Sequence, residues 1–155
     1  ATPCPMQTSN GGEMPTSADR YAVDTSVAVA TLDGAHAAHD TCRSTVAARR
    51  PTLAGHAAFE TYSVLTRMPG ALTIDGPTAA DVLRRVFPDV SWLSAEQASA
   101  LLARCGPLGI VGGAIYDALV GEAARLDGRT LLTRDNRARR TYDLLGVEYE
   151  LVGIF

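Results

Sequence analysis

From residue 20 onward, short apolar runs alternate with longer stretches in which apolar residues recur at helical spacing. The predicted strands cover 20–24, 51–54, 90–93, 129–133 and 147–152. The predicted helices begin near Thr25 and then cover 36–49, 55–67, 78–87, 94–105, 112–126 and 136–145. Strands that are apolar throughout and are separated by helices favour a parallel sheet covered on both faces. The pattern therefore predicts an α/β protein with a three-layer α/β/α architecture.

Polar residues just before several of these helices match N-cap preferences. The predicted N-caps are Thr25 or Ser26, Thr78, and Ser94. Ser94 is followed three residues later by Gln97, which completes a capping box, and Thr78 is followed by Asp81, a weaker variant of the same signal. Gly146 follows the last helix, where a left-handed C-cap is common.

The length of 155 residues and the 46% hydrophobic content fit one globular domain, which we place at 19–155. Residues 1–18 have no periodicity, and we expect a disordered or partly vector-derived extension there. No apolar run approaches the roughly 20 residues of a membrane span. The N-terminus lacks a signal-peptide pattern, so we expect a cytoplasmic protein with no membrane partner. The cysteines Cys4, Cys42 and Cys105 form no CxxC pair, which argues against a disulfide framework or a zinc site.

The net charge of −3 does not by itself indicate a nucleic-acid-binding protein. All 14 basic residues are arginine, and the sequence contains no lysine. Arginine binds phosphate in a forked geometry that lysine cannot provide. Genomic codon bias is an alternative explanation for this composition.

Two aspartates follow predicted strands directly. Asp24 ends the first strand and precedes two hydroxyl residues, and Asp135 follows the strand at 129–133. If both strands are parallel, the two carboxylates lie at the same carboxyl edge of the sheet, where α/β proteins bind ligands. Each aspartate could alternatively be a simple helix cap.

Two further acids lie on predicted helices. Glu60 is in the middle of a helix, where an exposed surface role is the alternative. Asp117 is a poor helix former, and its neighbours on the same face include Gly113 and Gly121. Small residues there would leave the carboxylate in a shallow trough that a ligand can approach, although an ordinary surface aspartate is also compatible with the pattern.

Four converging carboxylates would repel one another and raise their pKa values unless a cation neutralised them. Ligation by oxygen alone selects Mg²⁺ or Mn²⁺, and one or two such ions could activate a water and stabilise the leaving oxygen of a phosphodiester. Ser26 and Thr133 lie beside Asp24 and Asp135 in the sequence and could orient a ligand or a bound water.

These motifs together resemble the PIN-domain ribonucleases, and most closely the VapC toxins of bacterial toxin–antitoxin pairs. The resemblance rests on Asp-Thr-Ser after the first strand, an isolated Glu, Gly-x-x-Tyr-Asp-Ala-Leu and Leu-Leu-Thr-Arg-Asp, and covers about residue 20 to the end. The residues that it implies for catalysis and metal binding are Asp24, Glu60, Asp117 and Asp135, supported by Ser26 and Thr133. It also implies a Mg²⁺- or Mn²⁺-dependent endoribonuclease, a homodimer, and a VapB-like antitoxin as partner. Some members carry a further acid where Asn136 and Arg137 stand here, and often an aromatic residue where Ala138 stands.

Other residues could assist RNA binding. The arginines that cluster after Asp135 are Arg134, Arg137, Arg139 and Arg140. At the rim of an acidic site they would bind RNA phosphates, and the alternative is a solvated helix face. We expect Phe87 and Trp92 to be core residues rather than a platform for base stacking, and His56 to be structural or superficial.

Two other classes of function remain open. A phosphoaspartate receiver or phosphatase also uses an aspartate after its first strand, but it needs a lysine, and the phosphatases need a second Asp where Ser26 stands. A catalytically silent module with the same fold could serve only for dimerisation and partner binding. Metal titration distinguishes this module from a nuclease.

Overall fold

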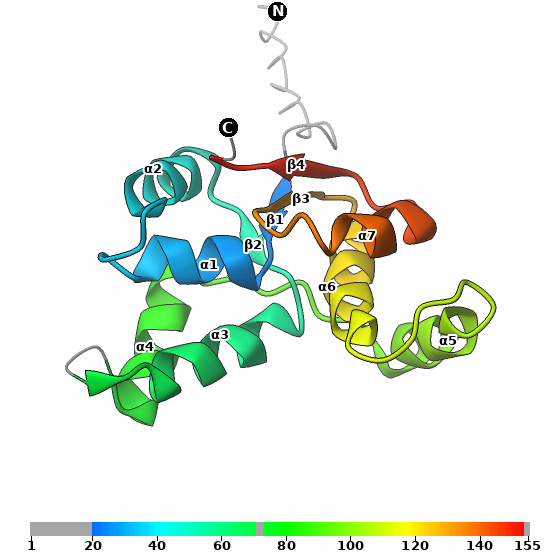
Figure 1. The fold of residues 1–155 in the computed structure, drawn as a ribbon, viewed down its shortest axis with the longest axis horizontal. Helices are drawn as coiled ribbons and strands as arrows, with labels where there is room; N and C mark the ends of the chain where they lie inside the picture. Colours follow the sequence, from blue (N-terminus) through cyan, green and yellow to red (C-terminus); the bar gives the residue numbers. More distant parts are fainter. Residues whose placement is uncertain (1–19, 71–72, 154–155) are drawn as a thin grey trace, which may run out of the picture.

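The computed structural model describes residues 20–70 and 73–153 (Figure 1). Its centre is a four-stranded, wholly parallel sheet with the strand order β2-β1-β3-β4. The strands are β1 (Tyr21–Val23), β2 (Thr52–Leu53), β3 (Thr130–Thr133) and β4 (Tyr149–Leu151). The predicted extension at 1–18 lies outside the described residues.

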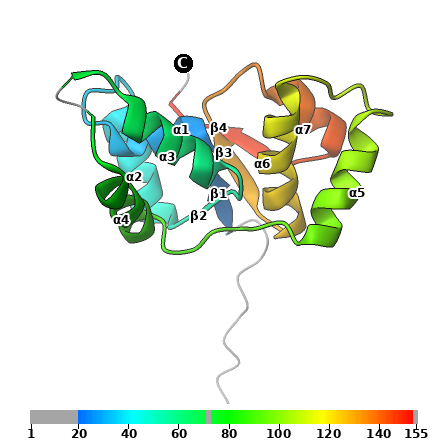
Figure 2. The same ribbon diagram turned by 90° about the horizontal axis from the view of Figure 1, so that it is seen from below.

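Seven described helices flank the sheet. They are α1 (Thr25–Leu32), α2 (His39–Arg49), α3 (Ala57–Arg67), α4 (Gly76–Val86), α5 (Ala95–Cys105), α6 (Ala114–Leu126) and α7 (Arg139–Leu145). Figures 1 and 2 show α1 to α4 on one side of the sheet and α5 to α7 on the other. The predicted three-layer α/β/α class is therefore confirmed.

The central strands are buried on both faces, as their apolar sequences predict. Val23 in β1 pairs with Leu53 in β2 and with Leu132 in β3, and all three side chains are buried. This register brings the carboxyl ends of the three strands to one edge. The amide of Asp24 continues the ladder by donating to the Leu132 carbonyl at 3.2 Å, which places Asp24 beside Thr133.

Residues 90–93 do not form the strand that the sequence predicts. It makes only an isolated bridge between Leu53 and Val90. Backbone hydrogen bonds from Leu53 to Asp89 and from Ser91 to Leu53 pair the chain briefly with β2, which is itself two residues long. The chain then leaves the sheet for the N-cap of α5, because only this short edge of backbone is available for pairing.

Two predicted N-caps are wrong. Asp24, and neither Thr25 nor Ser26, caps α1 by accepting from an amide in its first turn. Asp75 caps α4, which therefore begins at Gly76 before a proline in the first turn, where an amide donor is not needed. The capping box that begins at Ser94 is confirmed, and so is the left-handed glycine after α7, Gly146, with φ of 72°.

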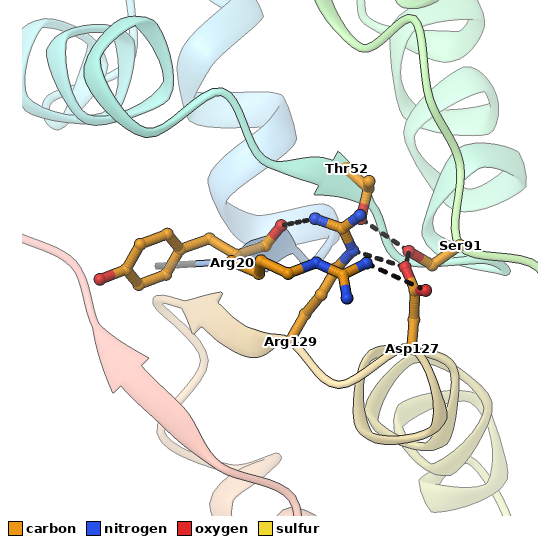
Figure 3. Close-up of polar contacts among 6 residues, drawn as sticks. Arg20, Thr52, Ser91, Asp127 and Arg129 are labelled. Atoms are coloured by element: carbon orange, nitrogen blue, oxygen red, sulfur yellow. Dashed lines mark hydrogen bonds and ion pairs between the residues drawn. The ribbon is translucent and has the colours of Figure 1, made fainter. Parts of the chain in front are cut away.

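A polar network joins the amino ends of the strands (Figure 3). Asp127, at the end of α6, accepts hydrogen bonds from Ser91 (2.6 Å) and Arg129 (2.5 Å) and lies 3.5 Å from Arg20. Thr52 bonds to Ser91 at 2.7 Å. Partial burial acts against ionisation of Asp127, but the hydrogen bonds and arginines hold its pKa below the usual range. The network ties the 87–93 connection to the sheet at the edge opposite Asp24.

Cys42 and Cys105 are buried free thiols, and Cys4 lies outside the described residues. Within 20–70 and 73–153, no helix is both long and apolar enough to cross a bilayer.

Candidate active site

Asp24 is buried at the carboxyl edge of β1, and both of its carboxylate oxygens accept hydrogen bonds. Oδ1 accepts from the Ser26 hydroxyl at 2.6 Å and from the Val27 amide at 3.0 Å. Oδ2 accepts from the Thr133 hydroxyl at 2.5 Å. Burial raises the pKa of Asp24, while these three hydrogen bonds oppose the rise. Asp24 is thus a helix cap and also a strongly oriented carboxylate.

The two hydroxyls beside Asp24 connect it to the end of β3. Ser26 Oγ accepts from the Arg134 amide at 2.8 Å, and Thr133 Oγ1 accepts from the Asp135 amide at 3.0 Å. Each hydroxyl therefore accepts a bond from the loop after β3 and donates one to Asp24. This arrangement fixes the relative positions of Asp24 and Asp135, which supports the orienting role predicted for Ser26 and Thr133.

Glu60 reaches the same edge from α3, which packs against α1. Its Oε2 accepts from the Thr25 hydroxyl at 3.2 Å, and its Oε1 lies 3.6 Å from His56 Nε2. The side chain is 37% exposed, so it is accessible from solvent although it is tethered on both sides. Thr25 and His56 were not expected to contact a site residue.

Asp117 faces the other three acids from α6. Its pKa is raised to about 6, first by burial and then by the charges of Asp135, Glu60 and Asp24, while Arg137 opposes the shift. Burial disfavours the ionised carboxylate, and nearby negative charges disfavour it further. Asp117 therefore shares an electrostatic environment with acids from three other parts of the chain.

A single small cavity of about 50 Å³ joins these side chains. Its lining residues are Asp24, Thr25, Ser26, Glu60, Asp117, Val120, Asp135 and Tyr142. The structure thus brings the four predicted acids together, from β1, α3, α6 and the loop after β3. Since one water occupies about 30 Å³ of liquid, the cavity has room for an ion or one to two waters but not for a nucleotide.

The donors suit a hard divalent cation, because they are carboxylate and hydroxyl oxygens whose charges repel one another. Within the described ranges, however, no group of three or more His, Cys, Asp and Glu side chains stands ready to hold a metal ion. The carboxylates instead take part in hydrogen bonds: Asp24 and Glu60 accept from neighbouring hydroxyls, and Asp135 Oδ1 accepts from the Arg137 amide at 2.8 Å. The residues fit such an ion in their chemistry and line one cavity, and joint ligation would require their side chains to change conformation.

Tyr142, on α7, lines the cavity but carries no signal in the sequence. It is buried, and its ring packs so closely against Gly121 that a Cβ added to this glycine would lie 2.9 Å from the ring. Burial and the charges of Asp24, Asp117 and Asp135 raise its pKa, so the hydroxyl stays protonated at neutral pH. Gly121 therefore makes room for Tyr142 rather than forming the trough beside Asp117 that the sequence suggested.

The four arginines after β3 do not all face the acids. Arg137, with a 94% exposed side chain, has its Nε 3.5 Å from Asp135 Oδ1. Arg134 instead donates to the carbonyls of Val152 and Gly153, at 2.6 and 2.8 Å. Arg139 lies over the ring of Tyr149, and Arg140 is exposed on α7. Arg137 is therefore the arginine of this group that the structure places next to a candidate ligand.

Aromatic side chains cluster beside the site. The ring of His56 stacks on Tyr116 with centroids 5.3 Å apart, and Phe59 lies 5.6 Å from Trp92. Trp92 is 57% exposed, so its predicted place in the core is wrong, whereas Phe87 is buried as predicted. Trp92 is exposed because its segment leaves the sheet instead of forming a buried strand.

Comparison with known proteins defines the family. The PIN domain family model matches residues 21–144. The chain belongs to the PIN-domain family. Ribonuclease VapC27 of Mycobacterium tuberculosis is 44% identical over 126 residues, which are 81% of this chain and 92% of the relative. Ribonuclease VapC40 of the same species is 41% identical over 133 residues, 84% of this chain and 98% of the relative. The resemblance to the VapC branch of PIN-domain proteins is confirmed.

Solved PIN-domain structures share the fold at low sequence identity. The M. tuberculosis VapC20 toxin, described as cleaving the sarcin–ricin loop, has a TM-score of 0.62 at 20% identity and covers 78% of this chain and 94% of its own. Rickettsia felis VapBC2, bound to a promoter DNA fragment, has a TM-score of 0.60 at 16% identity, and the match covers 85% of this chain and 98% of the other. FitAcB of Neisseria gonorrhoeae has a TM-score of 0.56 at 12% identity, and the match covers 83% of this chain and 95% of the other.

Proposed function

We propose that this PIN-domain protein is a Mg²⁺- or Mn²⁺-dependent endoribonuclease, the toxin of a type II toxin–antitoxin pair. The observation that carries the proposal is that carboxylates from four separate elements line one cavity. Two relatives above 40% identity are named as ribonucleases, which supports RNA as the substrate. The absence of lysine from the sequence argues against a phosphoaspartate protein.

In this proposal one or two ions are held by Asp24, Glu60, Asp117 and Asp135. When bound, such an ion supplies a nucleophilic water at neutral pH and stabilises charge on the leaving oxygen. The other residues position these ligands. Ser26 and Thr133 fix both oxygens of Asp24, and Tyr142 contributes a neutral hydroxyl to the inner wall of the cavity.

The small volume of the cavity restricts where RNA can lie. About 50 Å³ cannot admit a nucleotide, so the scissile phosphate must meet the acids at the mouth of the cavity. There the phosphate would be near Arg137, which is nearly fully exposed and adjacent to Asp135. A guanidinium in this position can bind a phosphate oxygen on one side of the cleaved bond.

Two partners belong to the proposal. A VapB-like antitoxin would neutralise the toxin, in line with structural relatives that include VapBC2. We also propose a homodimer, and the exposed, adjacent rings of Phe59 and Trp92 offer an apolar surface for it, because large apolar patches on soluble domains are usually covered by a partner. Light scattering should show that the wild type is a dimer and that Trp92→Ser weakens the dimer. A monomeric wild type would contradict the proposed homodimer.

The direct test is RNA cleavage by purified protein with and without Mn²⁺. Asp24→Asn and Asp117→Asn should each lower the cleavage rate at least about 100-fold, as expected for loss of a group that acts on the reacting centre. Asparagine is used at position 24 because it can still cap α1. Asp40→Asn, at an exposed position of α2, is the control and should cleave normally. Full cleavage by the double variant would contradict the proposal. A wild type that cleaves RNA neither with nor without Mn²⁺ would favour the alternative, a module that only binds a partner.

A further inference from the structure

The rings of His56 and Tyr116 form a stack between two of the helices that carry acids. His56 is the N-cap of α3, and Tyr116 lies in the first turn of α6. The ring centroids are 5.3 Å apart, and the ring planes are 14° from parallel. Glu60 on α3 and Asp117 on α6 both line the acid cavity. The stack therefore joins α3 to α6 next to two of the four carboxylates.

His56 is the tethered member of the stack. Its Nε2 lies 3.6 Å from Glu60 Oε1, one turn further along α3, and its side chain is 30% exposed. Its ring centroid also lies 6.2 Å from that of Phe59. These contacts restrict the His56 ring, which in turn supports one face of the Tyr116 ring.

Tyr116 is the exposed member of the stack. It directly precedes Asp117, and Val120, one helical turn later on the same side of α6, lines the acid cavity. Tyr116 is nevertheless 52% exposed. Within 20–70 and 73–153, His56 is the one aromatic ring paired with it. A large, supported aromatic surface is thus open to solvent beside the acids.

The size of the acid cavity determines where the bases of a bound RNA can lie. A cavity of about 50 Å³ leaves the bases outside, against the protein surface around the mouth. Neighbouring residues have Cα atoms about 3.8 Å apart, so a phosphate at Asp117 and a base on Tyr116 would belong to the same or to adjacent nucleotides. Stacking on aromatic rings is the usual way in which proteins hold unpaired bases.

We infer that Tyr116, supported by His56, is a stacking subsite for an unpaired base next to the cleaved phosphodiester. The inference rests on the proposed function, since it concerns how that nuclease holds its substrate. Arg137 would bind the phosphate, and Tyr116 would bind the base. A contact with a second copy explains the exposure of Tyr116 less well, because a protein surface laid over this ring would also cover the approach to Asp117.

The test separates the contribution of the base from that of the phosphates. The probes are a fluorescently labelled oligouridylate, whose bases stack little on one another, and a ribose-phosphate oligomer of the same length without bases. Their affinities for the purified full chain are compared by fluorescence anisotropy in EDTA, which prevents metal-dependent cleavage. The wild type should bind oligouridylate at least about fivefold more tightly than the abasic oligomer, the lower end of what stacking on one ring contributes.

Three variants assign this preference to the Tyr116 ring. Tyr116→Leu should bind both probes equally, whereas Tyr116→Phe should keep the preference because it keeps the ring. Tyr62→Leu is the matched control, since Tyr62 is 40% exposed on α3 and, among the described residues, belongs to no aromatic pair. It should bind the two probes as the wild type does.

A measurement on the wild type does not depend on how any variant folds. Oligouridylate containing 5-iodouridine cross-links on irradiation to an aromatic ring that its base contacts, and mass spectrometry then locates the modified residue. The expected residue is Tyr116. A cross-link at Trp92 instead would overturn the inference and place the base in the neighbouring hollow of about 190 Å³, which His56 and Phe59 also line.

The outcomes separate the inference from the proposed function. Equal binding of both probes by the wild type, or a preference that Tyr116→Leu retains, would overturn the inference even if the protein cleaves RNA. A lost preference accompanied by a change in the mass of Tyr116→Leu in light scattering would also overturn it and assign the ring to a dimer contact. A lost preference at unchanged mass supports the inference, and cleavage with Mn²⁺ then tests the proposed function on its own.

Discussion

Replacing Asp117 with asparagine should stabilise the metal-free protein at neutral pH. Folding raises the pKa of Asp117 from 3.8 to about 6, chiefly through burial and then through Asp135, Glu60 and Asp24. The protonated form is therefore favoured in the folded state. The fold loses stability as pH rises from 3.8 through about 6, and above that the full penalty is present. Asparagine has the same shape and no charge, so it removes the penalty.

The size of the effect follows from the shift. A rise of about 2 pKa units corresponds to about 3 kcal/mol, at about 1.4 kcal/mol per unit. Asp117 is only partly buried, and solvent screening reduces this value, so we expect about 1–2 kcal/mol. For a protein of this size that corresponds to a rise in Tm of roughly 3–6 °C. The gain should be smaller at pH 5, where part of Asp117 is already protonated.

The assay is thermal and chemical unfolding in EDTA at pH 7.5 and pH 5, repeated with Mn²⁺. Asp40→Asn is the control: Asp40 lies in the first turn of α2, where its charge is slightly favourable, so its removal should be neutral or mildly destabilising. Mn²⁺ should stabilise the wild type by about 3 kcal/mol at 100 times its Kd, and should stabilise Asp117→Asn far less. An Asp117→Asn variant that is less stable than the wild type in EDTA at pH 7.5 would refute the reasoning.

Three further predictions concern the fold. In urea unfolding, Gly121→Ala should lower the free energy of unfolding by about 1–3 kcal/mol, because the added Cβ would lie 2.9 Å from the ring of Tyr142. Gly113→Ala should be close to neutral in the same assay, because a Cβ at Gly113 would face open space. Ser94→Ala should cost about 1 kcal/mol in the same assay through loss of its cap, and an unchanged midpoint would contradict the capping box. Because folding lowers the pKa of Asp127, the wild type should lose stability as pH falls below about 4. Asp127→Asn should be less stable than the wild type at pH 7 and should lose less stability on acidification. Equal dependence of stability on pH in the two proteins would argue against the network.

The sequence predicts the parallel sheet and the convergence of the acids for a definite physical reason. The strands that carry Val23 and Leu132 are apolar throughout, and this pattern requires burial on both faces. Parallel strands then place Asp24 and the loop with Asp135 at one edge, and the two helices that carry Glu60 and Asp117 complete the cavity.

The details that the sequence did not predict depend on tertiary packing. Whether 90–93 forms a strand depends on how much of β2 is free to pair, which local propensity does not contain. Tyr142 lines the acid cavity because α7 packs against Gly121 of α6, a contact between two helices that the pattern of neither helix indicates. The direction of Arg134, toward the carbonyls of Val152 and Gly153, likewise depends on where the chain passes after β4.

The proposed activity depends on Asp24, Glu60, Asp117 and Asp135 jointly holding a divalent cation. Calorimetric titration of Mn²⁺ into the purified full chain tests it most directly, with the wild type compared against Asp24→Asn, Glu60→Gln, Asp117→Asn and Asp135→Asn. We predict saturable binding by the wild type and affinity at least tenfold weaker in each variant, with Asp40→Asn unaffected. A wild type that releases no binding heat and gains no thermal stability with Mn²⁺, or four variants that bind as tightly as the wild type, would contradict the claim.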